Sequence, residues 1–233
     1  MSLPKIEIPT YRVNLSGINK TIKYRAYTVK EEKVLLMAVQ SREQKEIMET
    51  ILRSCQECIF DDIIVKDLPI TDLEKLMVSI RSKSVGETTK TALSCPHCEE
   101  KTDIEINLEN MKEISDITIE SVVQLNEDYG LQLKPPTMSS ISDNITSEQE
   151  LLTNSIVSAI QNVFDKENVY VFSDYTDEEK NKFVDDLSIE DAKKITEGYL
   201  SKLPKNVIDI NYKCPHCNKK VKRELDNLVD FFT

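Results

Sequence analysis

The sequence contains the four-residue turn Cys-Pro-His-Cys twice, at residues 95–98 and 214–217. The two turns hold four of the six cysteines of the chain and both of its histidines. A Cys-x-x-Cys turn offers two thiolates, and four thiolates complete the closed tetrahedral site that is typical of structural zinc. Each turn supplies half of such a site, so we expect one structural Zn²⁺ per chain. The expected ligands are Cys95, Cys98, Cys214 and Cys217.

Other uses of these cysteines are disulfide bonding and redox chemistry. Disulfides are disfavoured in a reducing cytosol, and a redox-active Cys-x-x-Cys turn lies at a helix N-terminus rather than between strands. His97 and His216 each lie between two cysteines of one turn, so we expect them to be exposed or locally hydrogen-bonded. A closed four-thiolate site leaves no position for substrate, which favours a structural role over catalysis.

A third Cys-x-x-Cys pair, Cys55 and Cys58, lies inside a predicted helix. Cys55 continues the apolar stripe of Ile47 and Ile51 at helical spacing. We therefore expect two buried thiols here rather than a second metal site.

Each Cys-Pro-His-Cys turn is flanked by segments that alternate apolar and polar residues, as strands do. Residues 89–108 predict one β-hairpin and residues 206–228 predict another, each with the turn at its tip. Lys101 and Lys220 follow the two turns at the same offset. The two hairpins are expected to be zinc knuckles that together form a zinc-ribbon-like element.

Helices and a further hairpin are expected elsewhere in the chain. Residues 6–15 and 21–27 predict an N-terminal β-hairpin with a turn at 16–19. Thr28 and Glu31 have the capping-box pattern and predict a helix to about Cys58. The remaining expectations are a helix at 71–82, an extended stretch at 117–133, a linker at 134–144, and helices at 147–164, 177–187 and 189–203.

These elements predict an α+β fold with a helical insertion between the two knuckle hairpins. A chain of 233 residues is long enough for one domain or two small lobes. The expected regions are 1–110 with the first knuckle, 111–145 as an extended or linker segment, 146–206 as a helical region, and 207–233 with the second knuckle and a C-terminal tail.

Charge and composition exclude several classes of function. The net charge of −11 works against broad contact with nucleic acid. Residues 218–223 form a local basic segment, which fits either a solvated strand face or a basic patch. No segment reaches the roughly 20 apolar residues that span a bilayer. The first residues have neither the basic nor the apolar region of a secretory signal, so we expect none. We find neither a phosphate-binding loop nor a catalytic constellation, and we expect no small-molecule substrate.

The segment Leu228–Phe232 places two adjacent aromatic residues beyond the second hairpin. Exposed aromatic side chains are characteristic of interaction sites. We expect Phe231 and Phe232 either to pack against the core or to contact a partner protein.

Three stretches resemble the T4-type bacteriophage baseplate protein family. They are "LPKIEIPTYRVNLSGINKTIKYRAYTVKEEKVLLMA" at Leu3–Ala38, the internal Cys-Pro-His-Cys hairpin, and "LSKLPKNVIDINYKCPHCNKKVKRELDNLVDFF" at Leu200–Phe232. The resemblance implies a non-enzymatic protein that helps to build the baseplate hub of a contractile-tailed phage. It implies hub or wedge proteins as partners and the host cytoplasm as the place of assembly, and it leaves open whether the protein stays in the virion.

Two functions of other classes remain as alternatives. The first is a phage accessory protein that binds nucleic acid through a zinc ribbon, for which salt-sensitive DNA binding would be the sign. The second is a thiol oxidoreductase, which would carry a readily alkylated cysteine of low pKa. Zinc-held sulfurs would be protected from alkylation.

Overall fold

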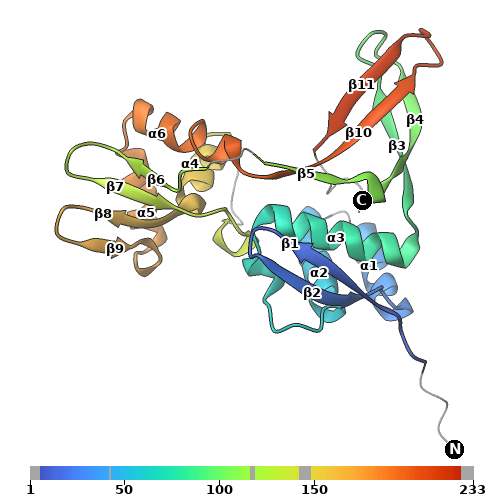
Figure 1. The fold of residues 1–233 in the computed structure, drawn as a ribbon, viewed down its shortest axis with the longest axis horizontal. Helices are drawn as coiled ribbons and strands as arrows, with labels where there is room; N and C mark the ends of the chain where they lie inside the picture. Colours follow the sequence, from blue (N-terminus) through green and yellow to red (C-terminus); the bar gives the residue numbers. More distant parts are fainter. Residues whose placement is uncertain (1–5, 42, 116–118, 142–147, 227–233) are drawn as a thin grey trace, which may run out of the picture. The chain divides into compact units, whose positions relative to one another are not determined.

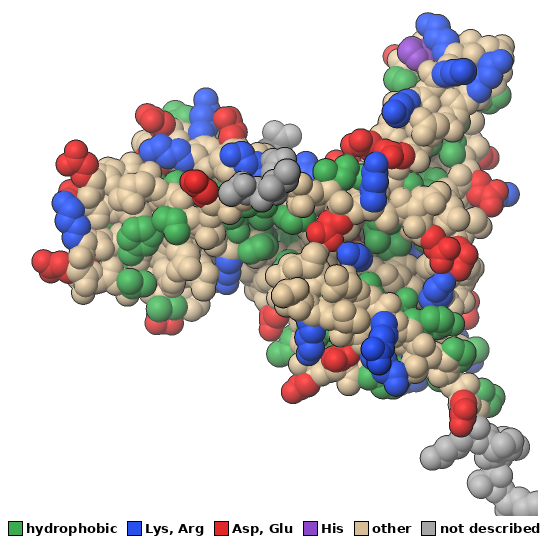
Figure 2. Space-filling view, in the orientation of Figure 1, with side chains coloured by type: hydrophobic (Ala, Val, Ile, Leu, Met, Phe, Trp, Pro, Cys, Tyr) green, Lys and Arg blue, Asp and Glu red, His purple; other side chains and the backbone are tan. Residues whose placement is uncertain are grey.

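The computed structural model describes residues 6–41, 43–115, 119–141 and 148–226. It confirms the expected mixture of helices and strands (Figure 1). Among the described residues, no helix is both long and apolar enough to cross a bilayer. Charged side chains are distributed over the surface that Figure 2 presents.

The chain divides into two compact units. Unit 1 comprises Met1–Val65, Thr71–Ile114 and Lys205–Thr233, and unit 2 comprises Lys66–Ile70 and Ser115–Pro204. Both knuckle hairpins therefore belong to unit 1, although most of unit 2 separates them in sequence.

Unit 1 contains three helices and seven strands within its described part. The helices are α1 (Val29–Ser41), α2 (Gln44–Cys58) and α3 (Ile70–Val85), the last beginning at the unit boundary. The strands are β1 (Thr10–Leu15), β2 (Lys20–Arg25), β3 (Thr88–Ser94), β4 (Lys101–Asn107), β5 (Lys112–Ile114), β10 (Lys205–Lys213) and β11 (Lys220–Leu225).

The N-terminal hairpin, β1 paired with β2, is confirmed. Its turn is fixed to α3 by Asp72, a fully buried carboxylate that accepts hydrogen bonds from the backbone N–H groups of Gly17 and Ile18, both at 3.0 Å. These two bonds satisfy a buried charge that would otherwise cost several kcal/mol. The hairpin thus rests on the same helix that supports the knuckle hairpins.

The single helix expected from residue 29 to Cys58 is wrong, because α1 ends at Ser41 and α2 begins at Gln44. Its start is as expected: the Glu31 carboxylate accepts hydrogen bonds from the Thr28 N–H, at 2.7 Å, and from the Thr28 hydroxyl. The Ser41 hydroxyl donates to the carbonyl of Ala38 at 2.8 Å, where α1 ends. The two shorter helices pack against each other, and this tertiary contact outweighs the continuous helical propensity of the sequence.

The second knuckle hairpin, β10–β11, belongs to a three-stranded sheet with the order β11-β10-β5, in which β10 is the central strand. The first knuckle hairpin, β3–β4, forms its own two-stranded sheet. All neighbouring strands in both sheets are antiparallel. Figure 1 shows the two hairpins running beside each other towards their tips.

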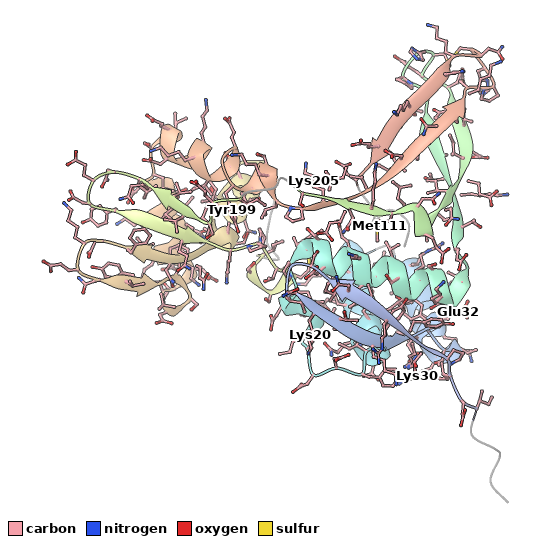
Figure 3. The ribbon with its side chains drawn as sticks, viewed as in Figure 1. Lys20, Lys30, Glu32, Met111, Tyr199 and Lys205 are labelled. Atoms are coloured by element: carbon pink, nitrogen blue, oxygen red, sulfur yellow. The ribbon has the colours of Figure 1, made fainter. Side chains whose placement is uncertain are left out.

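One apolar cluster holds the bases of both hairpins on α3. It consists of Val78, Ile106, Leu108, Ile208 and Ile210, all at most 5% exposed. Met111, labelled in Figure 3, packs against this cluster between β4 and β5. Because the cluster takes residues from both hairpins and from α3, burying it brings sequence-distant strands together.

A buried asparagine adds a polar tie between β10 and α3. Asn206, only 1% exposed, donates from Nδ2 to the carbonyl of Thr71 at 2.7 Å and to the Glu74 carboxylate at 3.1 Å. Lys205, labelled in Figure 3, begins the same strand one residue earlier. The second knuckle hairpin is therefore positioned from its first residues.

Unit 2 combines helices with a four-stranded antiparallel sheet of order β6-β7-β8-β9. The strands are β6 (Val122–Gln124), β7 (Gly130–Leu133), β8 (Ile160–Phe164) and β9 (Val169–Val171). The helices are α4 (Glu148–Ala159), α5 (Asp177–Asp185) and α6 (Ile189–Thr196). Its core includes Ile156, Val163, Ile195 and Tyr199, the last labelled in Figure 3.

Two expectations for this unit are corrected. The helix expected at 147–164 ends at Ala159, because residues 160–164 pair as β8 with the neighbouring strands on both sides. The helix expected at 189–203 ends at Thr196, near Gly198, where a Cβ atom would approach the carbonyl oxygen of Lys194 to 2.2 Å. Helices are present as expected, but the sheet beside them was only partly foreseen.

Candidate metal centre

The first Cys-Pro-His-Cys turn is closed by two backbone hydrogen bonds. The Cys95 N–H donates to the carbonyl of Glu100 at 3.0 Å, and the Glu99 N–H donates to the carbonyl of Cys95 at 2.8 Å. Glu99 has a φ of 62°, in the left-handed region. The tight loop directs Cys95 and Cys98 towards one side, as a pair of metal ligands requires.

The second turn repeats this geometry. The Cys214 N–H donates to the carbonyl of Lys219, and the Asn218 N–H donates to the carbonyl of Cys214, both at 2.9 Å. Asn218 has a φ of 61°, within one degree of its counterpart in the first turn. The repetition in sequence is therefore a repetition in backbone structure.

The structure brings the four expected ligands together. The Sγ atoms of Cys95 and Cys217 are 3.8 Å apart, and those of Cys98 and Cys214 are 3.7 Å apart. All four sulfurs lie within 4.8 Å of one another. Each short distance joins one hairpin to the other, so the cluster exists only because the two tips meet.

These distances fit a tetrahedral thiolate site. A zinc–sulfur bond of about 2.3 Å places two sulfurs of a tetrahedron about 3.8 Å apart. Disulfide-bonded sulfurs would be about 2.05 Å apart, and all four cysteines are free thiols. The donor set and its spacing therefore fit one metal ion held by four sulfurs.

The sulfurs differ in their ease of ionisation. At Cys214 the backbone N–H of Cys217 has the largest effect, and the pKa falls to about 6. At Cys98 the backbone N–H of Glu100 lowers the pKa, but burial and the other three sulfurs outweigh it and raise the value to about 12. Ionisation of one sulfur therefore raises the pKa of the neighbouring thiols, and a bound dication would remove this repulsion between thiolates.

Apolar packing shields one side of the sulfur cluster. Cys95 and Cys214 are at most 1% exposed and pack with Val221, while Tyr212 contacts the same cluster. A site excluded from water on one side favours retention of a bound ion. Tyr212 and Val221 were not predicted from the sequence. Strand alternation could have found them, because Tyr212 lies two residues before Cys214 and Val221 lies one residue after the exposed Lys220, which turns both side chains inwards.

The other candidate residues lie apart from this cluster. His97 and His216 are exposed, and neither belongs to the group of possible metal ligands found among the described residues. Cys55 and Cys58 are buried in α2 as expected, and burial raises the pKa of their thiols to about 12 and about 11. Phe231 and Phe232 lie outside the described residues.

Comparison with known proteins identifies the family. The family model described as T4 bacteriophage base plate protein matches residues 8–233, which is nearly the whole chain. Searches of curated proteins and of solved structures found no match. The expectation from the sequence is confirmed: the chain belongs to the T4 bacteriophage base plate protein family.

Proposed function

We propose that this protein is a non-enzymatic phage tail baseplate protein, which acts either as a hub assembly factor or as a hub subunit. The family match over residues 8–233 is the observation that carries the proposal. The protein acts through contacts with other baseplate proteins, namely those of the hub or the wedges. It is made in the host cytoplasm and acts there during assembly of the baseplate.

We further propose that the four-cysteine cluster binds one Zn²⁺ through Cys95, Cys98, Cys214 and Cys217. The support is the spacing of 3.7 and 3.8 Å between sulfurs of different hairpins, which matches a tetrahedral zinc thiolate site. With all four positions taken by protein, the ion has no open site for a reacting molecule. Its role is to hold the two hairpins tip to tip.

Affinity purification from infected cells tests the assembly role. The tagged protein should co-purify with hub or wedge proteins, identified by mass spectrometry, and tail particles probed with antibody would show whether it stays in the virion. Enrichment of replication or transcription proteins instead, lost after nuclease treatment, would contradict the proposal and support the nucleic-acid-binding alternative.

Elemental analysis of the purified chain tests the metal. We expect one zinc per chain in the wild type and a loss of nearly all of it in Cys217→Ser. The matched control is Cys58→Ala, which removes one thiol from α2 without touching the cluster and should keep its zinc. A wild-type chain that folds without metal would overturn the assignment.

A further inference from the structure

One face of the second knuckle hairpin gathers positive charge. In the register of β10 and β11, Lys213 lies directly opposite Lys220, and Asn211 lies opposite Lys222. Side chains on one face of a strand recur every second residue, so the three lysines share one face, called here the basic face. All three are exposed.

The lysines of the basic face are not neutralised within the described part of the chain. None of the three forms an ion pair with a described carboxylate, whereas Asp209, further along the same face, is paired with Lys112 at 2.6 Å. Glu224 follows Lys222 on this face and makes no ion pair with it. Figure 2 shows Lys and Arg side chains gathered at the end of the hairpin pair.

The arrangement works against folding rather than for it. Like charges directly opposite each other on neighbouring strands destabilise a sheet, and Lys213 and Lys220 are such a pair. The first knuckle hairpin avoids the problem, since Ser94 faces Lys101 at the position of the Lys213–Lys220 pair, and Ala92 faces Asp103 at the position of Asn211 and Lys222. The zinc turn therefore does not require a basic flank.

We propose that the basic face is a docking surface for a compact cluster of Asp and Glu side chains on another protein. The inference rests on the proposed function, because it supplies a contact surface for a protein that acts through protein partners. A carboxylate brought opposite Lys213 and Lys220 would relieve their repulsion and form charge-assisted hydrogen bonds. Binding would thus supply a counter-charge beside Lys213 and Lys220, which face each other across the strands.

Protein carboxylates fit this face better than nucleic acid does. Tight binding to duplex DNA neutralises about 6–10 phosphates, whereas the basic face offers three lysines in a small area. The neighbouring first turn adds the exposed acidic residues Glu99 and Glu100, which would repel an extended polyphosphate. The net charge of −11 acts in the same direction.

The first test measures binding of a fluorescent oligoglutamate peptide by anisotropy, with a labelled DNA duplex as the second arm. The variant carries Lys213→Gln, Lys220→Gln and Lys222→Gln. The control carries Lys30→Gln, Lys33→Gln and Lys66→Gln, which removes the same charge from exposed positions outside the two knuckle hairpins. Equal zinc contents would show that both variants keep the metal centre.

We expect the basic-face variant to bind the peptide about tenfold more weakly, as the loss of three exposed ion pairs predicts, and the control to stay within about twofold. The binding should weaken between about 50 mM and 200 mM salt. Equal losses in the two variants, or no binding by the wild type, would overturn the proposal. Tighter binding of DNA that is lost in the same variant would replace it with a nucleic-acid site.

Purification from infected cells separates this inference from the proposed function. If the wild type brings down baseplate proteins and the basic-face variant brings down fewer of them, both ideas stand. If both chains bring them down equally, the basic face is not the docking surface but the assembly role survives. If the wild type brings down none, the assembly role fails by itself.

Discussion

The two knuckle hairpins share a backbone and differ in charge. Both turns are closed by the same pair of hydrogen bonds, and their left-handed residues have φ values of 62° and 61°. Yet residues 94–105 carry four acidic residues and one lysine, whereas residues 213–224 carry five basic residues and one glutamate. The proposed metal ligation would account for what the hairpins have in common, and it requires no particular residue at the positions where they differ. Those positions are where a specific role in binding can be encoded.

The largest expected effect tests whether the hairpins depend on each other. Cys95→Ser and Cys214→Ser should each release the metal and lower the free energy of unfolding by several kcal/mol, because structural zinc contributes on the order of 10 kcal/mol. Removal of the metal by a chelator should have the same effect on the wild type. Zinc content and thermal unfolding are the measurements.

The double variant sharpens this test. Since either substitution already opens the shared site, the double variant should be no less stable than the single variants, which is a strongly non-additive result. Additive losses, or a single variant that keeps its zinc, would show that each hairpin holds metal independently.

A smaller effect on stability is expected at two matched positions of the hairpins, Thr102 and Val221. Thr102 in β4 has a buried hydroxyl without a hydrogen-bond partner among the described residues, whereas its counterpart Val221 in β11 is apolar and 3% exposed. Thr102→Val should stabilise the protein by about 1 kcal/mol, and Val221→Thr should destabilise it by about 1–2 kcal/mol. Denaturant unfolding of the two variants would show opposite shifts. A loss of stability in Thr102→Val would contradict this prediction.

The two residues with positive φ, Glu99 and Asn218, can be exchanged between the turns in the same way. Asparagine tolerates positive φ better than glutamate does, so Glu99→Asn should stabilise the first turn by about 0.5–1 kcal/mol. Asn218→Glu should destabilise the second turn by a similar amount. Unfolding in denaturant of the zinc-loaded chains measures both, and a gain from Asn218→Glu would contradict the equivalence of the turns.

The smallest effect concerns the facing lysines. Lys220→Glu converts a like-charge pair with Lys213 into an opposite-charge pair and should stabilise the protein by a few tenths of a kcal/mol. Its matched control is Lys101→Glu, which faces the neutral Ser94 and should change little. A gain in stability together with a loss of oligoglutamate binding would show that the basic face serves binding rather than folding. A destabilised Lys220→Glu would argue for a structural role of that lysine.

The cluster of four cysteines could be predicted from sequence because its signal is local. Each Cys-x-x-Cys turn identifies two candidate ligands, and strand alternation on both sides of it defines a hairpin. The end of α1 at Ser41 and the start of α2 at Gln44 could not be predicted in this way, since no glycine or proline interrupts residues 29–58. That break depends on packing between α1 and α2. Likewise, residues 160–164 become β8 because strands on both sides pair with them, and this pairing is not a property of the segment alone.

The basic face could be predicted from the sequence only in part. Residues 218–223 were visible as a basic segment in the sequence, but the significance of Lys213 was not. It follows from the register, which places Lys213 opposite Lys220 across the turn. A solvated strand face and a clustered basic patch have the same composition, and only the pairing of the strands distinguishes them.

The separation of the half-sites also has a consequence during protein synthesis. Between Cys98 and Cys214 lie 115 residues, which a ribosome adds in about 10 s. Throughout that interval the nascent chain carries Cys95 and Cys98 without the two cysteines of the second turn. A metal ion held by all four sulfurs would therefore bind only after residues 99–213 have been synthesised.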